Sequence, residues 1–247
     1  MYNTIDLNCD MGEGMMYDAQ LMQLISSANI ACGFHAGDED TMNKTIELAI
    51  ENKVAIGAHP GFPDKEYFGR RNLPMSTIEI YEIVTAQIVI LKKIADQFKI
   101  KLHHVKPHGA LYNLAAKDRT IAQSIAHAVN DADSTLMLYG LSGSYLVSEA
   151  HAIGLKTVSE VFADRTYQDD GTLTPRTDAN ALIETEEKCI AQVLQMTDEQ
   201  TVTSVHTVCV PIVAQTICLH SDGKNAVAFA KKIVEALKQQ QIEISAP

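Results

Sequence analysis

Short apolar runs with the spacing of β-strands alternate with segments of helical periodicity along the whole chain. The strand-like runs cover residues 4–10, 29–35, 54–59, 101–109, 135–140, 156–164 and 214–220. The helical patterns cover residues 18–28, 41–53, a stretch that opens at Ser76, and about 118–130, 144–153, 178–196 and 225–241. Residues 201–213 are ambiguous, and an extra hairpin is one solution. Seven βα units in series predict a parallel sheet with helices outside it.

The helix that opens at Ser76 has the clearest start signal. Glu79 follows Ser76 by three residues, which is the sequence pattern of a capping box. Apolar residues then recur at helical spacing from Ile80 to Ile94, and Gln87 is the one polar residue on that face.

The ends of the strands help to choose between a barrel of seven or eight strands and an open, doubly wound sheet. Polar residues end nearly every run: Asp10, His35, His59, His108, Asp164 and His220. In a barrel all of these ends meet at one mouth, whereas an open sheet gathers ligands at a single switch point. We therefore expect a barrel, and we find no linker that would divide residues 1–247 into two domains.

Composition narrows the class of partner. The 247 residues carry a net charge of −11, which argues against nucleic acid or an anionic membrane as the main partner. The five cysteines form no C-x-x-C pair, and the first residues resemble no signal peptide. We expect a cytoplasmic protein with no transmembrane segment.

A repeated motif marks two strand ends. The sequences "GFHAG" (33–37) and "GAHPG" (57–61) share G-x-H-x-G and lie one βα unit apart. Glycines allow a sharp turn and a close approach of the backbone to a ligand. We interpret His35 and His59 as active-site residues, although a hydrogen-bonded histidine under a loop is the plainer explanation for either one alone.

The fourth strand contributes Lys106 and His108, which alternation places on the same face. A cation beside a histidine suits stabilisation of an oxyanion together with acid or base catalysis. The first strand places Asp6, Asn8 and Asp10 on one face in the same way, and Glu13 follows in a glycine-containing turn.

Asp10, His35 and His59 are candidates for a divalent metal site, because zinc accepts such nitrogen and oxygen ligands. A metal-free acid–base cluster of the same residues is the alternative. The ligands would come from separate strands, so no helical spacing supports the metal.

Two long loops near the strand ends carry arginines that suit an anionic substrate. Arg70 and Arg71 lie in residues 60–74, and Arg165 and Arg176 lie in residues 164–176. Further candidates for substrate binding are Glu13, Glu160, Asp164 and Asp222. No nucleotide-binding loop, nucleophile elbow or reactive-cysteine signature is present in the sequence.

Six segments together resemble the LamB/YcsF family: "DLNCDMGEG", "NIACGFHAGD", "GAHPGFPD...FGRR", "VKPHGALYN", "EVFADRTYQDDGTLTPR" and "ICLHSD". They span Asp6 to Asp222 in the family's order. The sequence departs from the family pattern at Ser221, where glycine is usual, and at Phe62, where tyrosine is usual. The resemblance implies a seven-stranded, barrel-like α/β fold of the glycoside hydrolase/deacetylase type.

The resemblance also implies a reaction, because this family supplies one of the three subunits of bacterial ATP-dependent 5-oxoprolinase. That activity hydrolyses 5-oxo-L-proline to L-glutamate with cleavage of ATP as co-substrate, and it needs two partner subunits, B and C. An unactivated lactam needs carbonyl activation, for which a partner would help with the phosphoryl step.

In that setting we expect Asp10, His35, His59 and His108 to hold or deprotonate water. Lys106 would stabilise the oxyanion, and an arginine such as Arg71 or Arg165 would bind the substrate carboxylate. Two alternatives remain open: a metal-dependent deacetylase or amidohydrolase that acts alone, and a non-catalytic lactam-binding subunit.

Overall fold

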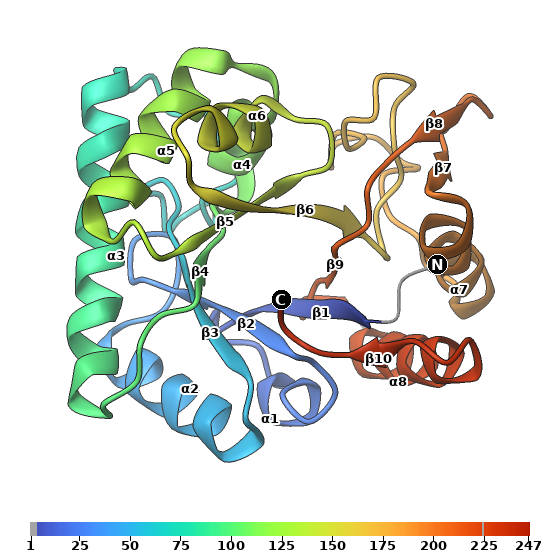
Figure 1. The fold of residues 1–247 in the computed structure, drawn as a ribbon, viewed down its shortest axis with the longest axis horizontal. Helices are drawn as coiled ribbons and strands as arrows, with labels where there is room; N and C mark the ends of the chain where they lie inside the picture. Colours follow the sequence, from blue (N-terminus) through green and yellow to red (C-terminus); the bar gives the residue numbers. More distant parts are fainter. Residues whose placement is uncertain (1–3, 224) are drawn as a thin grey trace.

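Seven parallel strands close into a barrel with helices around it (Figure 1), in a computed structural model that describes residues 4–223 and 225–247. The barrel strands are β1 (Thr4–Met11), β2 (Ser27–Ala31), β3 (Ala55–His59), β4 (His104–Val105), β5 (Met137–Leu141), β6 (Lys156–Phe162) and β9 (Thr216–Leu219). They pair in chain order, and β9 pairs with both β6 and β1, which closes the ring. The prediction of a barrel rather than an open sheet is confirmed.

The helices follow the strands and cover the outside of the barrel (Figure 1). They are α1 (Asp18–Leu21), α2 (Glu39–Asn52), α3 (Thr77–Gln97), α4 (Gly109–Lys117), α5 (Arg119–Ala132), α6 (Tyr145–Ala152), α7 (Glu186–Leu194) and α8 (Ala226–Gln239). The predicted capping box of α3 is present, because the Ser76 hydroxyl accepts from the Glu79 amide and the Glu79 carboxylate accepts from the Ser76 amide. None of the helices described here is long and apolar enough to cross a membrane.

Strand β2 and helix α1 differ from the predicted boundaries. The helix expected over residues 18–28 has only four residues, and the strand begins at Ser27 instead of 29. The hydroxyls of Ser26 and Ser27 donate to the Asp6 carboxylate at 2.6 and 2.7 Å, which ties this segment to β1. The strand ends at Ala31, before Gly33 turns the chain with φ +87°.

The fourth strand is shorter than the predicted range of residues 101–109, because only His104 and Val105 form a regular ladder. Pro107 has no backbone N–H to donate, and it interrupts the pairing. The chain stays close to β3, because the Lys106 amide donates to Ala58 and the His108 amide to Pro60. Helix α4, which the sequence pattern did not indicate, starts directly after His108 in a run of good helix formers.

The helix predicted over residues 178–196 starts later in the structure, where α7 begins at Glu186. Thr185 caps it by accepting from the Lys188 amide, and two glutamates occupy the first turn. A π-helical turn, η1 (Gln195–Glu199), follows. The ambiguous segment forms the hairpin of β7 (Thr201–Thr203) and β8 (Cys209–Pro211), and a short strand outside the predicted set, β10 (Glu243–Ile244), pairs with the start of β1.

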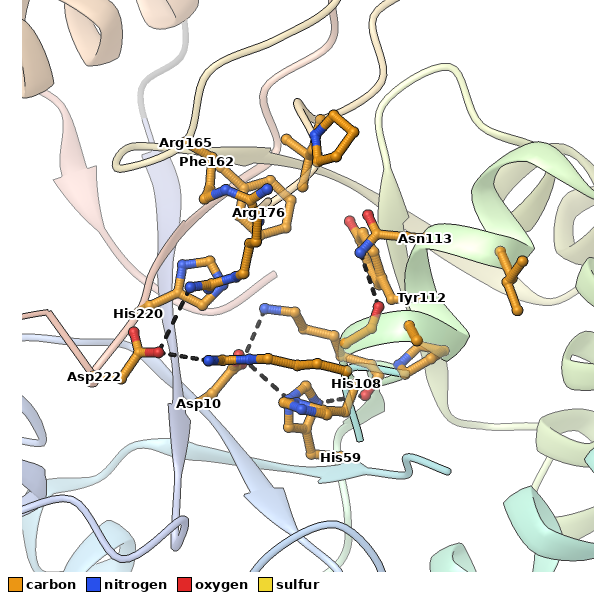
Figure 2. A pocket seen from close by; sticks show the side chains of 18 of the residues that line it. Asp10, His59, His108, Tyr112, Asn113, Phe162, Arg165, Arg176, His220 and Asp222 are labelled. Carbon is orange, nitrogen blue, oxygen red and sulfur yellow. Dashed lines mark hydrogen bonds and ion pairs between the residues drawn. The ribbon is translucent and has the colours of Figure 1, made fainter. Parts of the chain in front are cut away.

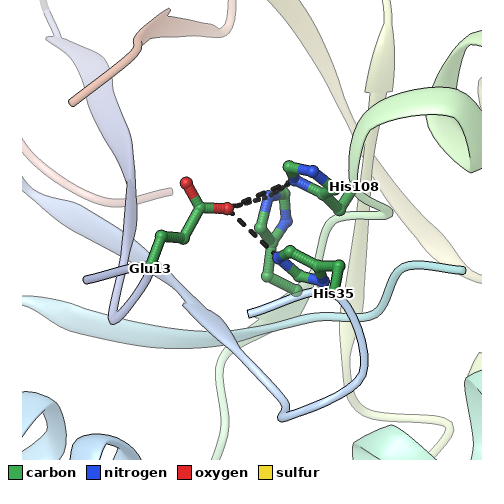
Figure 3. A group of neighbouring side chains, drawn as sticks. Glu13, His35 and His108 are labelled. Atoms are coloured by element: carbon green, nitrogen blue, oxygen red, sulfur yellow. Dashed lines mark hydrogen bonds and ion pairs between the residues drawn. The ribbon is translucent and has the colours of Figure 1, made fainter. Parts of the chain in front are cut away.

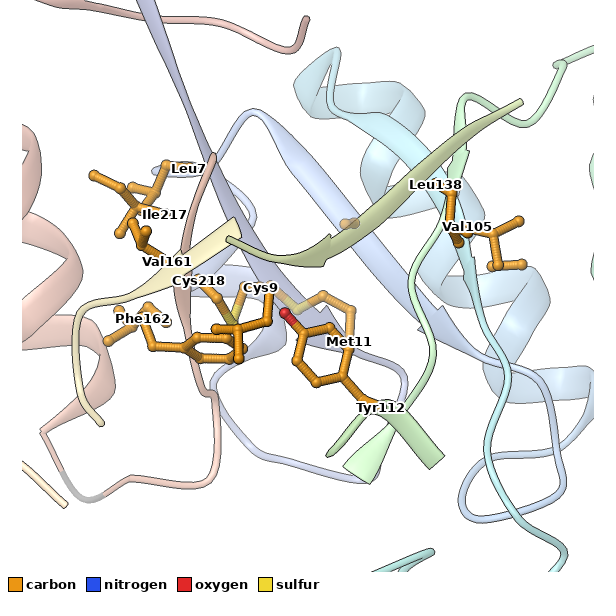
Figure 4. Close-up of a cluster of buried hydrophobic side chains, with 14 of the residues drawn as sticks. Leu7, Cys9, Met11, Val105, Tyr112, Leu138, Val161, Phe162, Ile217 and Cys218 are labelled. Atoms are coloured by element: carbon orange, nitrogen blue, oxygen red, sulfur yellow. The ribbon is translucent and has the colours of Figure 1, made fainter. Parts of the chain in front are cut away.

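Strand β1 shows how the core is divided. Leu7, Cys9 and Met11 are fully buried in an apolar cluster (Figure 4), and the alternate residues Asp6, Asn8 and Asp10 hydrogen-bond across the barrel interior. The expected inward face of β1 is therefore present. Buried polar groups need hydrogen-bond partners, and the polar side chains of this interior supply them to one another in a network.

Candidate active site at the barrel mouth

Asp6 on β1 is a buried polar group of the barrel interior. Its carboxylate accepts hydrogen bonds from the hydroxyls of Ser27 (2.7 Å) and Thr216 (2.6 Å). Burial raises the pKa of Asp6, and the surrounding hydroxyl donors offset part of that rise. No cation contacts Asp6 among the described residues, so hydroxyl donors alone satisfy it.

A layer of amides lies above Asp6. The Asn8 amide donates to Glu160 at 2.9 Å and accepts from Asn29 at 2.7 Å. The His104 Nε2 donates to the Asn29 oxygen at 2.7 Å. A Cβ atom on Gly57 would lie 2.2 Å from His104 Nε2, so only glycine leaves room for this imidazole inside the barrel.

The next layer is organised by Lys106, whose side chain is buried. Its ammonium lies 2.8 Å from Glu160 Oε1 and 3.0 Å from Asp10 Oδ1, and it also donates to Cys218 Sγ. Burial disfavours the charged form, but the charge of Asp10 and other neighbours, Glu160 among them, raises the pKa of Lys106 well above its usual value. Lys106 is therefore a fixed cation at neutral pH.

Glu13 and three histidines converge at the mouth (Figure 3). Glu13 Oε1 lies 3.1 Å from His35 Nε2, 3.3 Å from His108 Nδ1 and 3.8 Å from His59 Nε2. The rings of His35 and His108 stack with centroids 3.8 Å apart. Because the four ligand atoms all lie within 4.8 Å of one another, this group could hold a metal ion.

The protonation of this group follows its burial. Burial and the neighbouring imidazoles lower the pKa of His35 and of His108 well below the usual value. Burial, and then the charge of Asp10, raise the pKa of Glu13. The imidazoles of His35 and His108 are thus neutral at pH 7, which is the form in which histidine binds protons or metals.

The loop after β3 covers the histidines. Gly69 has φ +63°, and a Cβ there would lie 2.8 Å from His35 Cβ and 2.9 Å from His108 Cδ2. A Cβ on Gly61, at the end of the second G-x-H-x-G motif, would approach His35 Nδ1 similarly closely. The Gln87 side chain of α3 holds this loop by bonding both the N–H (3.0 Å) and the C=O (2.9 Å) of Gly61.

An Asp–His pair also lies at the mouth. His220 Nδ1 lies 2.9 Å from Asp164 Oδ1, and the His220 backbone N–H donates to the other carboxylate oxygen at 3.0 Å. Burial opposes ionisation of Asp164, yet His220 and its hydrogen bonds lower the pKa of this carboxyl below its usual value. The ionised Asp164 carboxylate accepts a hydrogen bond from the Nδ1–H of His220. The second ring nitrogen, Nε2, can therefore contact a ligand.

A cavity of about 460 Å³ joins these groups (Figure 2). Its lining includes Asp10, Glu13, His59, Lys106, His108, Tyr112, Phe162, Arg165, Arg176, His220 and Asp222, together with Arg70. The guanidinium groups of Arg70 and Arg176 both reach Asp222, and the Arg176 contact measures 3.6 Å. The volume fits a small molecule, and the lining offers both cations and proton carriers.

Three predicted binding residues are not placed to contact a ligand: they lie outside the cavity, lie beneath it or stabilise its wall. Arg71 forms two bonds to Asp64 (3.0 and 2.7 Å), stacks on Tyr67 and does not line the cavity. Glu160 is fully buried beneath Lys106. Arg165 lines the cavity, but its guanidinium donates to the backbone of Thr174 and Ala181 and fixes the loop there.

Other residues of the site carry only a weak signal in the sequence. His220 and Arg176 are visible in the sequence as a strand end and a loop arginine, but their partners, Asp164 and Asp222, lie more than 40 residues away from them. His104 carries no signal beyond its place in the fourth strand. Such long-range pairs cannot be found from spacing in one sequence.

Comparisons with known proteins agree with this fold. The sequence profile described as the LamB/YcsF family matches residues 5–247. A protein of Tolumonas auensis that is named as a 5-oxoprolinase subunit is 52% identical over 247 residues, with 98% of each chain covered.

Two solved structures bear on the fold. The lactam utilization protein of Thermus thermophilus superposes with a TM-score of 0.91 at 39% identity, covering 99% of this chain and 100% of that one. A family 4 carbohydrate esterase of Streptomyces lividans gives a TM-score of 0.54 at 11% identity, covering 98% and 92%. The second likeness concerns the fold alone, and it agrees with the expected deacetylase-type barrel.

Proposed function

The chain belongs to the LamB/YcsF family, and from this premise we propose that it is the lactam-opening subunit of an ATP-dependent 5-oxoprolinase. The observation that carries the proposal is one cavity that joins a fixed ammonium, an Asp–His pair and two arginines. A relative that is named as a 5-oxoprolinase subunit, identical at about half of the positions, supports the choice of substrate.

Ring opening makes four demands on a site. The oxygen of a water molecule bonds to the lactam carbonyl carbon, the C–N bond breaks, and the nitrogen gains a proton. The product is glutamate, with a new carboxyl group and a free amine. The site must therefore stabilise an oxyanion, hold and deprotonate the water, protonate the leaving nitrogen and bind the carboxylate that the substrate already carries.

Lys106 is suited to the oxyanion. Its ammonium is held by Glu160 and Asp10 and lines the cavity, so it needs no reorganisation when negative charge develops on the carbonyl oxygen. Asp10 fixes this cation and, together with Glu13 and the neighbouring imidazoles, forms the wall on which the water is held and deprotonated.

His220 is suited to the leaving nitrogen. Asp164 holds its Nδ1, which directs the other nitrogen, Nε2, to the cavity, from where a protonated ring can donate to the leaving nitrogen. One of the His220 ring nitrogens lies within 4.8 Å of an Asp10 carboxylate oxygen, so the proposed acid lies beside the wall on which the water is held.

The substrate carboxylate fits Arg70 and Arg176. Both guanidinium groups now pair with Asp222, and both line the cavity. A carboxylate of the substrate offers the same ligand atoms and binds arginine bidentately. We assign this role to Arg70 and Arg176 in preference to Arg71, which is engaged by Asp64.

ATP and partner subunits complete the proposal. An unactivated amide is a poor electrophile. Transfer of the terminal phosphoryl group of ATP to the carbonyl oxygen, with ADP as the leaving group, would activate it. Water then adds to the carbon, the C–N bond breaks, and a second water cleaves the resulting acyl phosphate to glutamate and inorganic phosphate. The sequence has no nucleotide-binding loop, so we assign the phosphoryl step to the partners B and C and the ring opening to this chain.

Reconstitution tests the proposal. The purified chain, its two partner subunits, ATP and 5-oxoproline are mixed, and glutamate is measured with each component omitted in turn. We expect glutamate only from the full mixture. Release of acetate from an acetylated sugar by the chain alone, with no glutamate from the full mixture, would favour the deacetylase alternative.

A further inference from the structure

We propose that Glu13, His35, His59 and His108 bind one divalent transition-metal ion of the zinc class at the barrel mouth. The proposal does not depend on the lactam chemistry: it gives Glu13 and the imidazoles of the water-binding wall a ligand role, and it leaves the roles assigned to Lys106, His220 and the two arginines unchanged. It rests on the distances among the four side chains and on the hydrogen bonds behind two of the imidazoles.

The distances among the ligand atoms fit a tetrahedral ion. Metal–ligand bonds of about 2.0–2.2 Å at tetrahedral angles place the ligand atoms about 3.3–3.6 Å apart. Glu13 Oε1 lies 3.1, 3.3 and 3.8 Å from the nearest nitrogens of His35, His108 and His59. These three spacings lie on both sides of the tetrahedral value, and all four ligand atoms lie within 4.8 Å of one another.

Hydrogen bonds to backbone carbonyls orient the imidazole rings of His59 and His108, so that one nitrogen of each ring faces the centre of the four-residue group. His59 Nδ1 lies 2.7 Å from the Lys106 carbonyl oxygen, and His108 Nε2 lies 2.8 Å from the Phe68 carbonyl oxygen. A carbonyl can only accept, so His59 Nδ1 and His108 Nε2 each donate a hydrogen bond to one, and the other nitrogen of each ring faces the centre of the group. Behind many metal-bound histidines the same kind of bond fixes the tautomer.

Two imidazole nitrogens face each other at the centre of the group. His59 Nε2 and His108 Nδ1 lie 3.0 Å apart. When each ring carries a single proton, both of these atoms are acceptors, and Glu13 beside them is a further acceptor when it is ionised. A metal ion coordinated by all three groups resolves the repulsion. A single shared proton is the competing explanation, and nitrogen NMR in the presence of metal separates the two.

The carboxylate ligand is Glu13 in this assignment, whereas the sequence suggests Asp10. Glu13 Oε1 approaches all three imidazoles. Asp10 Oδ1 is engaged by Lys106 and Asn29, and its other oxygen lies 3.3 Å from His59 Nε2. Asp10 therefore adjoins the ion, and its remaining oxygen can orient a group bound there.

The ion would be accessible from the cavity. Glu13, His59 and His108 line it, while His35 is buried behind them. His35 Nδ1 has no partner among the described residues, so no second hydrogen bond fixes its tautomer. We expect His35 to contribute less to affinity than His59 or His108.

Metal binding by the full-length chain tests the proposal without substrate, ATP or partners. The chain is stripped with a chelator, and Zn²⁺ binding is measured by calorimetry and elemental analysis. Co²⁺ in place of Zn²⁺ reports the geometry through its visible absorption. We expect one ion per chain, a tetrahedral cobalt spectrum, and a loss of affinity of more than about 100-fold in His59→Ala and His108→Ala.

Two kinds of variant keep the outcome clear. Glu13→Gln is isosteric and should also lose affinity while circular dichroism stays native. His220→Asn lies in the same cavity outside the group, and His127→Asn lies on the exposed face of α5, so both should bind Zn²⁺ as wild type does.

Absence of stoichiometric binding, or equal binding by wild type, Glu13→Gln and His59→Ala, would overturn the proposal. So would a proton shared by His59 and His108 that persists in nitrogen NMR spectra when Zn²⁺ is in excess. Failure of the glutamate assay leaves this result untouched, and failure of Zn²⁺ binding leaves the assay untouched.

Discussion

At the scale of single residues, Lys106 links the barrel interior to the candidate site. Its side chain is buried, which excludes the alternative of a surface lysine, and it touches carboxylates from both β1 and β6. Strand alternation predicts that Lys106 and His108 share a face. The partners of Lys106 could not be predicted, because Glu160 lies 54 positions further along the chain and meets it only when the barrel closes.

Removal of the Lys106 charge should destabilise the fold. Lys106→Met leaves Asp10 and Glu160 buried without their cation, and a broken buried pair costs about 3–5 kcal/mol. Urea unfolding measures the loss, and adding Glu160→Gln should restore part of it. The exposed Lys101→Met is the control and should stay within about 0.5 kcal/mol of wild type. Equal stability of Lys106→Met and Lys101→Met would contradict the buried network.

The Asp164–His220 pair should act as a unit in the proposed reaction. Asp164→Asn removes the acceptor that fixes the His220 tautomer, so kcat should fall by about 10²–10⁴ while KM for 5-oxoproline changes little. His220→Asn should cause a similar loss, and the double variant should be no slower than the slower single variant. Multiplicative losses in the double variant would show that the two residues act independently.

At the scale of elements, the loop between β3 and α3 covers the histidine group. The sequence shows Gln87 as a polar exception on an apolar helix face, but it does not show what the side chain binds. In the structure the exception is explained, because the Gln87 amide pairs with both backbone groups of Gly61. The G-x-H-x-G motif is a similar case. Its glycines predict a turn, but they do not predict which imidazoles pack against that turn.

Substitution of Gln87 should loosen this loop. Gln87→Leu keeps much of the apolar volume but leaves the N–H and C=O of Gly61 buried and unpaired, at a cost of about 1–3 kcal/mol for each group. Thermal unfolding should show the loss, and limited proteolysis should cut within residues 60–74 faster than in wild type. Gln123→Leu is the matched control. It removes a partly buried side-chain hydrogen bond to Glu149 and should leave loop cleavage unchanged. Wild-type cleavage in Gln87→Leu would mean that the loop is held by other contacts.

At the scale of the whole molecule, the barrel explains why residues from separate parts of the chain meet. The alternation of βα units and the polar strand ends predict a barrel and a shared mouth, and both the closed sheet and the cavity agree with that prediction. Exact strand limits could not be predicted, because side-chain bonds such as that of Ser27 to Asp6 and the missing N–H of Pro107 set them. The polar interior distinguishes this barrel from those filled by branched apolar residues.

Glutamate release from 5-oxoproline by the complex of this chain with its partner subunits tests the proposed function most directly. The complex is assembled with wild type, Lys106→Met, His220→Asn or the exposed control His127→Asn, and glutamate is followed with and without ATP. We predict ATP-dependent release by wild type and the control, and a loss of more than about 100-fold with the two cavity variants. Release at the wild-type rate by folded Lys106→Met and His220→Asn complexes, or no release by wild type, would contradict the proposed function.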